Sequence, residues 1–479
     1  MRKSRIILVG IFIIVIAFFL FFLNKKDSST GALEGISENK TIDEAFALIT
    51  KHAVYPVSDE KLVEGAIRGM TDTIGDPYST YFSEEEARAH EQSLSDERVG
   101  IGAEITQSQG RFIIVSPIKS SPAEKAGIKP YDEIVQVNGE RVDGKSLKEL
   151  LQLIGGEKGT EVTLTLYRPE EQRHVKISIM RSTIPVKTVT SETFDVEGQT
   201  IGYVTISMFG EKTAEEWEQH TSDLLKRGVE GIIIDVRSNP GGYLHSVEKV
   251  AGSMLKPGAT YTFMQDSRGI LEPLTVKQPE ETAYTKKMKK IPVAILQNEG
   301  SASASEVLSG ALKDLKRAFI IGTTSFGKGT VQETMELSNG GEVKLSTHKW
   351  LTPNQQWIHG KGIKADLEVE QNVLFKLSAK PVGGQYATGD YSDDIAYAQN
   401  ALNSMGYDVT RTDGYFDEVT AKAVEDFRQD KGLSLEPQMD HYFFVKLREV
   451  IQSYKERKEN DDQLQMAIGY MSHTIKSGK

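Results

Sequence analysis

The chain has 479 residues, of which 57 are Lys or Arg and 68 are Asp or Glu, so its formal net charge is −11 at pH 7. This negative balance argues against nucleic acid as a partner. The absence of cysteine excludes disulfides, thiol catalysis and cysteine-based metal sites. The length predicts two to four domains.

The first 30 residues are expected to form a membrane segment and a tether. Residues 6–23 are uncharged and apolar, a stretch just long enough to cross a bilayer as a helix. Arg2, Lys3 and Arg5 precede this stretch, which favours an inside N-terminus with the bulk of the chain outside. Because no small-x-small cleavage site follows residue 23, an uncleaved anchor is favoured over a signal peptide.

Residues 31–97 are expected to form an N-terminal helical segment. Within residues 58–74 the apolar side chains fall on one helical face, and Ser58 is a plausible N-cap. Turn residues, "GDPYSTYFS", follow that helix. Since helical arms of this sort usually pair with a partner, we expect the segment to contribute to a homodimer.

Residues 98–182 show the succession of short strands, helices and turns that is typical of a small separate domain. The strands "GIGAEI" and "RFIIVSPI" precede a short helix, "SPAEKAG", and the strand "DEIVQVNG" ends in an Asn-Gly turn. An amphipathic helix and two alternating strands complete the pattern. This order, and above all "SPAEKAGIKPYDEIVQVNGE", resembles a PDZ domain of the type associated with bacterial proteases.

The PDZ resemblance implies a peptide-binding site. Its loop would offer backbone N–H groups to a peptide carboxylate, and the peptide would add as a strand along the sheet edge. The loop residues are Val99, Gly100, Ile101 and Gly102. Arg168, at the end of a strand, would bridge the PDZ domain to the peptide or to the following domain; the alternative is a solvated arginine.

Residues 183–378 predict an α/β core. The runs "TIGYVTI", "GIIIDV", "IPVAIL" and "AFIIG" are short, rich in Ile and Val, and separated by polar or helical sequence. Alternating strands and helices argue for a mainly parallel sheet whose strands are buried on both faces.

The segment "ILQNEGSASASEVLSGAL" carries three serines, Ser301, Ser303 and Ser305, between a strand and a helix. Ser303 and Glu306 form an S-x-x-E capping box, so a plain helix start is one interpretation. A second interpretation makes Ser303 a nucleophile, because its hydroxyl lies at the positive end of a helix and the Ala304 N–H can face an oxyanion.

A serine nucleophile needs a base, and no histidine has a convincing acid partner nearby. His245 is the best placed and His348 lies in an alternating segment, but the sequence favours Lys328, which stands between two glycines after a strand. Burial lowers the pKa of a lysine from about 10.4 towards about 7–8, where the amine can act as a base. Gln332 lies four residues on, on the same face of an extended segment, and would orient the amine.

The stretch around Lys328, "GTTSFGKG", is also close in sequence to the G-x-x-x-x-G-K-[ST] pattern of a phosphate-binding loop. Gly329 stands where Ser or Thr must bind magnesium, and the alternating "VQETMEL" predicts a strand where such a loop opens a helix. Nucleotide binding is therefore disfavoured.

Four motifs in this chain, "SASASE", "FGKGTVQ", "DVRSNPGG" and "GDPYSTYF", resemble those of the carboxyl-terminal processing (tail-specific) serine protease family. The resemblance implies Ser303 as nucleophile, Lys328 as base and Gln332 as its orienter. It also implies an oxyanion hole from Ala304 and a glycine, with Gly241 favoured and Gly242 left open. No metal or other cofactor is implied.

Residues 391–479 are expected to form a C-terminal helical module that ends in a mostly polar helix. Residues 395–433 resemble a three-helix peptidoglycan-binding module, with Arg428 where Gln is usual. Its hallmark positions are Gln399, Leu402, Gly406, Gly414, Phe416, Thr420, Ala423, Val424 and Phe427. Cell-wall contact and a purely dimer-forming cap both remain open.

The expected architecture is thus an α/β protease core, a mixed sheet with helices, with an inserted PDZ domain, an N-terminal helical segment and a C-terminal module. The resemblance implies a serine endopeptidase that cuts protein or peptide substrates at the extracytoplasmic face of the cell membrane. With the membrane segment and the C-terminal module included, the whole chain resembles the member of this protease family that spore-forming bacteria use between two membranes. The rival hypothesis is a non-catalytic scaffold that binds peptides and wall. Whether the PDZ domain activates or inhibits stays open.

Overall fold

The computed structural model describes residues 40–478, apart from short gaps at 95–96, 109–110, 119–120, 130–131, 169–170, 186, 278–281 and 378–383. The chain divides into two compact units, Met1–Ser83 and Glu84–Lys479. Within the described residues, none of the helices combines the length and apolar character that a bilayer-spanning segment needs. The anchor expected at residues 6–23 lies outside them.

The first unit is helical, as expected. It contains α2 (Lys40–His52), α3 (Asp59–Asp72) and β1 (Thr80–Phe82). The predicted N-cap of α3 is confirmed, because the Ser58 hydroxyl accepts a hydrogen bond from the backbone N–H of Lys61 at 3.3 Å. None of the side chains of α2 is buried.

The domain expected to be PDZ-like is built on an antiparallel sheet. Its elements are β3 (Ala103–Ser108), β4 (Arg111–Pro117), α5 (Pro122–Lys125), β5 (Glu133–Val137), β6 (Glu140–Arg141), α6 (Leu147–Ile154), β7 (Glu161–Arg168) and β8 (Arg173–Met180). The strand order is β3-β4-β5-β7-β8, so β3 is an edge strand. Asn138 and Gly139 have φ values of 53° and 84°, the left-handed pair that the predicted Asn-Gly turn requires.

Three further elements flank this domain. They are α4 (Glu84–Leu94), β2 (Glu97–Gly100) and β9 (Ser182–Pro185). β2 and β9 pair antiparallel and bring the entry and exit of the domain together. The domain is therefore inserted between the N-terminal elements and the core, as expected.

The predicted α/β core is confirmed. Its sheet has the order β10-β11-β12-β15-β16-β19, with β10 antiparallel to β11 and the remaining pairs parallel. The strands are β10 (Val189–Val196), β11 (Gln199–Ile206), β12 (Gly231–Asp235), β15 (Val293–Gln297), β16 (Phe319–Gly322) and β19 (Leu367–Glu368). The four apolar runs singled out in the sequence form β11, β12, β15 and β16.

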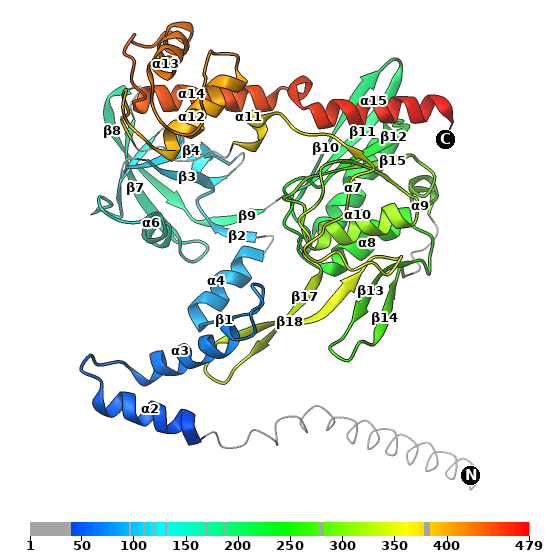
Figure 1. Cartoon of the computed structure of the whole chain (residues 1–479), viewed down its shortest axis with the longest axis horizontal. Helices are drawn as coiled ribbons and strands as arrows, with labels where there is room; N and C mark the ends of the chain where they lie inside the picture. The colour runs from blue at the N-terminus through cyan, green and yellow to red at the C-terminus, as the bar shows by residue number, and fades with distance from the viewer. Residues whose placement is uncertain are drawn as a thin grey trace, which may run out of the picture. The chain divides into compact units, whose positions relative to one another are not determined.

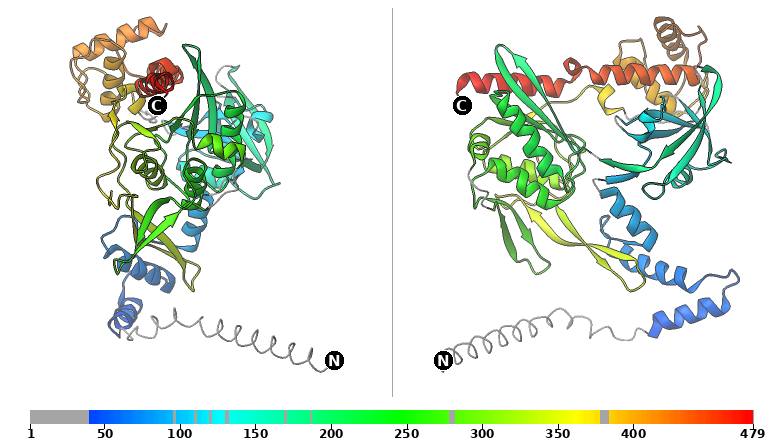
Figure 2. Two further views of the ribbon diagram at one scale, coloured as in Figure 1. Left: turned by 90° about the vertical axis from the view of Figure 1, so that its right-hand side faces the viewer. Right: turned by 180° about the vertical axis from the view of Figure 1, so that it is seen from behind.

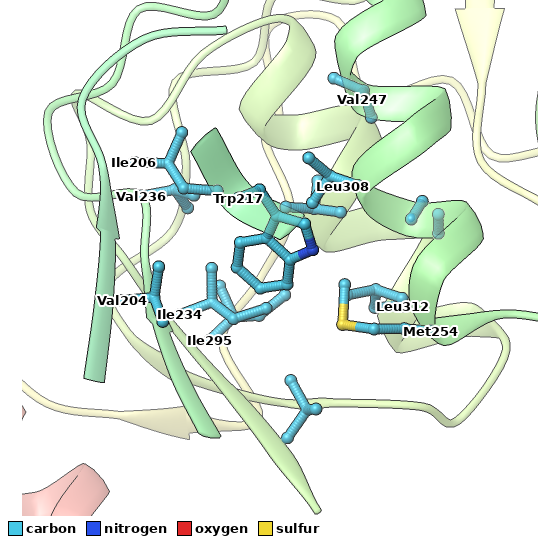
Figure 3. Close-up of a cluster of buried hydrophobic side chains, with 14 of the residues drawn as sticks. Val204, Ile206, Trp217, Ile234, Val236, Val247, Met254, Ile295, Leu308 and Leu312 are labelled. Atoms are coloured by element: carbon cyan, nitrogen blue, oxygen red, sulfur yellow. The ribbon is translucent and has the colours of Figure 1, made fainter. Parts of the chain in front are cut away.

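Helices cover both faces of this sheet (Figure 1, Figure 2). One face carries α7 (Thr213–Lys226), α8 (Leu244–Met254) and α10 (Ala304–Asp314), and α9 (Ala283–Met288) lies beside α7 and α8. Figure 3 shows the core on this face, where Trp217 lies among Ile206, Ile234 and Leu308. Since β-strand side chains alternate in direction, Ile233 points to the opposite face.

A second, antiparallel sheet extends from the core. It contains β13 (Thr260–Gln265), β14 (Leu271–Thr275), β17 (Thr330–Glu336) and β18 (Glu342–Leu351), which pair as β17-β18-β13-β14. β17 begins immediately after the Lys328 loop. The alternating sequence there was correctly predicted to be a strand, and the helix that a phosphate-binding loop requires is replaced by this strand.

The C-terminal module is a helical domain with its own core. It comprises α11 (Val373–Lys376), α12 (Asp393–Ser404), α13 (Glu418–Asp430) and α14 (His441–Glu456). Among its hallmark residues, Gln399 and Thr420 are fully buried and hydrogen-bonded to each other at 2.9 Å. Arg428 is also buried and binds Asp440 and the carbonyl of Ser434. These positions therefore have structural roles.

The expectation of one final, mostly polar helix is wrong in two respects. The chain breaks at η2 (Lys458–Asn460), and a separate helix, α15 (Asp462–Ser477), follows. Leu464, Ala467, Ile468 and Met471 are buried against the second face of the core sheet. Their spacing is that of one helical face. α15 is therefore part of the protease core rather than of the C-terminal module.

Candidate active site

The turn between β15 and α10 presents Ser303 in a strained conformation. Ser303 precedes the helix directly and has φ 55° and ψ −114°, whereas N-cap residues are ordinarily extended. A non-glycine residue in such a region costs about 1–3 kcal/mol, and strain of this kind clusters at functional sites. The carboxylate of Glu306 accepts from the Ser303 N–H at 2.9 Å, so this half of the predicted capping box is present. Ser303 is therefore both the first residue before a helix and a residue in a strained backbone conformation, so the two interpretations of its sequence are compatible.

The two neighbouring serines have structural roles. Ser301 Oγ donates to the Val236 carbonyl at 2.7 Å, and Ser305 Oγ donates to the Asn239 carbonyl at 3.0 Å. Both serines are fully buried, whereas Ser303 is half-buried. Ser303 is thus the serine of this run that is placed to meet a substrate.

The loop after β12 brings Gly241 against the nucleophile turn. A Cβ atom on Gly241 would lie 2.8 Å from Cβ of Ser303 and 3.0 Å from the backbone nitrogen of Ala304. Because such distances are too short for any side chain, only glycine fits here. The Gly241 N–H donates to Asn239 Oδ1 at 2.9 Å, so in this structure that donor is used within its own loop.

Gly242, the other oxyanion candidate, packs against a different neighbour. A Cβ atom there would lie 2.2 Å from the carbonyl oxygen of Phe209, and φ is 137°. The structure thus brings Gly241 closest to Ser303 and Ala304. A hole with two donors needs either the Gly241 N–H to leave Asn239 or the Gly242 N–H to serve in its place.

Glu306 joins the nucleophile turn to the Lys328 loop. Its carboxylate is fully buried and accepts four hydrogen bonds. Oε2 accepts from the backbone N–H groups of Ser303 at 2.9 Å and Lys328 at 2.8 Å. Oε1 accepts from the Gly327 N–H at 2.6 Å and the Ser325 hydroxyl at 2.7 Å. Four donors fill the acceptor capacity of a carboxylate, so a single side chain holds both backbones.

Two tryptophans fix the carbonyl groups of the same loop. Trp350 Nε1 donates to the Lys328 carbonyl at 2.8 Å, and Trp357 Nε1 donates to the Gly329 carbonyl at 2.8 Å. A Cβ atom on Gly329 would lie 2.9 Å from Trp357 Nε1. Gly327 has φ 93° and equally close backbone neighbours. This crowding explains why glycines flank Lys328.

Gln332 lies on β17, where its amide nitrogen donates to Thr330 Oγ1 and to Ser346 Oγ, both at 3.0 Å. These two hydroxyls use both amide hydrogens, so the amide oxygen is the atom that can accept from an amine. The β17–β18 register is irregular between Val331 and Gln332. Simple strand alternation, which predicted a face shared with Lys328, therefore does not run unbroken through this point.

The histidines considered as triad members have other contacts. His245 stacks on Tyr243 with ring centroids 5.2 Å apart, and His348 Nδ1 is hydrogen-bonded to Thr347 Oγ1 at 2.9 Å. Two histidines that the sequence analysis did not single out are close to the lysine loop. His359 Nδ1 accepts from the Gly329 N–H at 3.4 Å. Burial, together with the charges of Lys344 and Lys328, lowers the pKa of His90.

Sequence reasoning missed the positioning groups. Glu306 was identified only as a helix cap, and the capping box was the one local signal for it. Trp350 and Trp357 had no local signal, because their roles depend on a fold that returns them to Lys328. Within the described part of the chain, no group of three or more His, Asp or Glu side chains has a metal-binding arrangement.

In the PDZ-like domain, the residues predicted to form the carboxylate loop precede the edge strand β3, but Val99 and Gly100 are the last two residues of β2 and pair with β9, so only Ile101 and Gly102 lie outside a strand. Val99 is exposed, Gly100 is half-buried, and Ile101 and Gly102 are buried. Gly102 has φ 75°, and its carbonyl accepts from Ile118 N–H at 2.8 Å and Ser121 Oγ at 2.9 Å. These two hydrogen bonds fix the Gly102 carbonyl at one end of β3.

Arg168 lies inside this domain. Its Nε and Nη2 donate to the two carboxylate oxygens of Asp132, both at 2.8 Å, and Nη2 also donates to the Gly127 carbonyl. The residue is 7% exposed, so the solvated alternative is wrong. These contacts hold the β5 and β7 ends of the domain together, and the hydrogen-bond partners of the Arg168 guanidinium are Asp132, Gly127 and Glu171 rather than residues 99–102.

Comparison with protein families gives four matches along the chain. Peptidase family S41 matches residues 200–369, and a PDZ domain matches residues 99–179. The activating protease CtpB N-terminal domain matches residues 22–86, and a putative peptidoglycan binding domain matches residues 391–435. α15 lies beyond all four.

Relatives match over most of the chain. It is similar to the carboxy-terminal processing protease CtpB of Bacillus subtilis (strain 168), with 39% identity over 89% of this chain and 88% of the relative. It is also similar to the carboxy-terminal processing protease CtpA of the same organism, with 37% identity over 93% of this chain and 92% of the relative. Among solved structures, the photosystem II D1 C-terminal processing protease matches with 26% identity and a TM-score of 0.45, over 70% of this chain and 94% of that one.

Proposed function

Because the chain belongs to the carboxy-terminal processing proteases of peptidase family S41, we propose that it is a serine endopeptidase with Ser303 as nucleophile and Lys328 as general base. The observation that carries this proposal is the Glu306 carboxylate, one oxygen of which binds the backbones of both residues. A carboxylate so placed ties the backbones of the serine and the lysine together across two separate loops.

The chemistry needs only groups of this chain and water. Ser303 Oγ attacks the scissile carbonyl carbon while the Lys328 amine accepts its proton. The Ala304 N–H, with that of Gly241 or Gly242, stabilises the developing oxyanion. Collapse breaks the C–N bond, and the Lys328 ammonium returns the proton to the leaving amine. Water then hydrolyses the acyl-enzyme with Lys328 again as base.

Gln332 would orient the amine. Its amide oxygen can accept one ammonium hydrogen without adding a negative charge that would raise the pKa of the lysine. The bonds from its nitrogen to Thr330 and Ser346 support this role, because they fix the amide against a flip.

Substrate capture is assigned to the PDZ domain. The loop of residues 99–102 would bind a C-terminal carboxylate through backbone N–H groups, and the peptide would add to β3. The position of β3 at the sheet edge supports this assignment, since its outer hydrogen-bonding side faces no other strand within the described sheet. The domain would thereby select protein C-termini of varied sequence.

The N-terminal unit is proposed to act as anchor and dimer contact. α2 buries none of its side chains, and Ile42, Leu48 and Ile49 are 43–53% exposed. On α3, Met70 is 54% exposed. Exposed apolar residues at helical spacing are typical of surfaces that pair with another chain, and a second copy is the proposed occupant.

We propose that the catalytic domain lies at the extracytoplasmic face of the cell membrane, with residues 6–23 as its anchor. The C-terminal module is assigned a contact with the cell wall. By resemblance to the spore-forming type, we further propose a regulatory role in the space between two membranes during sporulation.

The test is cleavage of casein by protein lacking residues 1–30. Ser303→Ala should abolish cleavage, whereas Ser301→Ala and Ser305→Ala should keep most of it at temperatures where they remain folded. Wild-type cleavage by Ser303→Ala would refute the nucleophile assignment. An inactive wild-type protein that still binds peptides would favour the scaffold hypothesis.

A further inference from the structure

Arg237, at the start of the loop that carries Gly241, lies between two carboxylates. Its Nε is 3.0 Å from each oxygen of Asp235, and its Nη2 is 2.6 Å from Asp235 Oδ2. Nη1 and Nη2 donate to the two oxygens of Asp461 at 2.8 and 2.7 Å. The side chains of Arg237, Asp235 and Asp461 are only 13%, 6% and 7% exposed. This is a bidentate ion pair shielded from water, the strongest geometry for such a contact.

Asp461 is fixed from the other side by α15. As the N-cap of that helix it accepts from the Leu464 N–H at 3.0 Å, and it also accepts from Gln371 Nε2 at 2.7 Å. α15 in turn packs tightly on the sheet, because a Cβ atom on Gly231 would lie 2.4 Å from Met471 Sδ. The hydrogen bonds from Leu464 and Gln371, which do not involve Met471, thus hold the carboxylate in place beside Arg237.

The backbone next to Arg237 holds the oxyanion loop on the nucleophile turn. Ser238 has φ 56°, and its N–H donates to Asn298 Oδ1 at 2.7 Å. The next carbonyl, of Asn239, accepts from the Ala302 N–H at 2.9 Å and from Ser305 Oγ at 3.0 Å. A shift of Arg237 would thus be passed directly to the residues that flank Ser303.

We infer that Asp461 is a positioning residue for catalysis: through Arg237 it holds the oxyanion loop in register with Ser303, so the N-cap of α15, and not the body of that helix, contributes to the active site. The inference deepens the proposed function and rests on it. It concerns a residue that lies outside the segment matched by the protease family and outside the segment matched by the peptidoglycan-binding family.

The test compares Asp461→Asn with Met471→Ala, in protein lacking residues 1–30. Both changes weaken the attachment of α15, but only the first touches Arg237. Trp217 and Trp350 are buried in the core and Trp357 is hydrogen-bonded to the loop beside it, so tryptophan fluorescence measures the thermal unfolding of the core. kcat and KM for casein cleavage are then measured at a temperature where every variant is folded.

Asp461→Asn is expected to lower kcat by about tenfold or more with little change in KM, because oxyanion donors act in the transition state and small displacements there are costly. Met471→Ala should lower the unfolding temperature at least as much yet keep kcat near wild type. Asp461→Glu, which retains the charge, should recover part of the loss. If Asp461→Asn does not fold, Gln371→Ala serves instead, and its kcat should fall about twofold or more because it loosens the Asp461 carboxylate.

Equal kcat in Asp461→Asn and Met471→Ala would overturn the inference and leave α15 a purely structural helix. That outcome would not affect the proposed function, which is tested separately by the Ser303→Ala and Lys328 variants.

Discussion

The backbone N–H groups of Ser303 and Lys328 donate to the same carboxylate oxygen of Glu306, at 2.9 and 2.8 Å. The turn that carries Ser303 and the loop that carries Lys328 follow different strands, β15 and β16, and parallel strands place their carboxyl ends at one edge of a sheet. The fold therefore brings the two loops together, and Glu306 sets their register.

Glu306→Gln should abolish turnover while the protein still folds at reduced stability. An amide has one acceptor oxygen, and its NH2 group would face two backbone donors in a buried site. The expected loss is roughly 2–4 kcal/mol of unfolding free energy. Initial rates of casein cleavage and tryptophan fluorescence would measure the two effects.

The matched control is Glu299→Gln. Glu299 lies in the same turn and accepts from Thr323 Oγ1 at 3.0 Å, but it is exposed. It should keep wild-type activity and stability. Similar losses in both variants would mean that the turn as a whole, rather than the link between the two loops, is sensitive.

Peptide binding to the PDZ domain should depend on a free carboxylate. A peptide with a hydrophobic C-terminus is expected to bind, and its C-terminal amide is expected to bind much more weakly, because the amide lacks the negative charge that backbone N–H groups of residues 99–102 would bind. Gly102→Ala should abolish the difference, since its Cβ would lie 2.4 Å from Cβ of Ser121 at a φ of 75°. Fluorescence anisotropy of labelled peptides measures this binding.

The effect of the same peptides on cleavage of a second substrate shows whether the PDZ domain activates or inhibits the protease domain. Stimulation by the free acid alone would mean that the domain activates, and inhibition by it would mean that the domain blocks. Equal binding of acid and amide would rule out recognition of the carboxylate by this loop.

Acid should weaken the attachment of α15. Burial alone would raise the pKa of Asp461, but the hydrogen bonds and charge of Arg237 outweigh it and hold that pKa below its ordinary value of 3.8. The ionised carboxylate therefore contributes stability above about pH 4, and this contribution is lost as the pH falls below that value. The stability difference between wild type and Asp461→Asn should shrink in the same range.

Urea unfolding followed by tryptophan fluorescence at several pH values between 6 and 3 would measure this difference. Other carboxylates titrate in both proteins and cancel in the comparison. A difference that stays constant down to pH 3 would show that Asp461 does not contribute through its charge.

Much of the fold could be predicted because its signals are local. The runs of Ile and Val in β11, β12, β15 and β16 identify buried parallel strands, and Ser58 and the Asn138–Gly139 turn mark element ends. The last helix was predicted to be mostly polar because polar residues are numerous in it, and its apolar face was overlooked. Leu464, Ala467, Ile468 and Met471 have helical spacing, but nothing local indicates that they cover the protease sheet.

The candidate site divides in the same way. Ser303, Lys328 and the glycines beside Lys328 lie in short motifs, so the sequence alone predicts them as candidate site residues. The groups that position them are distant in the chain: Glu306 is 22 residues from Lys328, and Asp461 is 224 residues from Arg237. Such pairs depend on the tertiary fold, and a single sequence carries no signal for them.

The central claim is that Lys328 acts as a base rather than as a fixed positive charge. Lys328→Arg keeps the charge, but a guanidinium stays protonated near neutral pH and cannot accept the serine proton. The most direct measurement is the single-turnover rate of casein cleavage by wild type, Lys328→Arg and Lys328→Ala between pH 6 and 9. The account predicts that the wild-type rate rises with pH and that the Arg variant is as inactive as the Ala variant. An Arg variant that cleaves well above the Ala variant, or a flat wild-type profile, would contradict it.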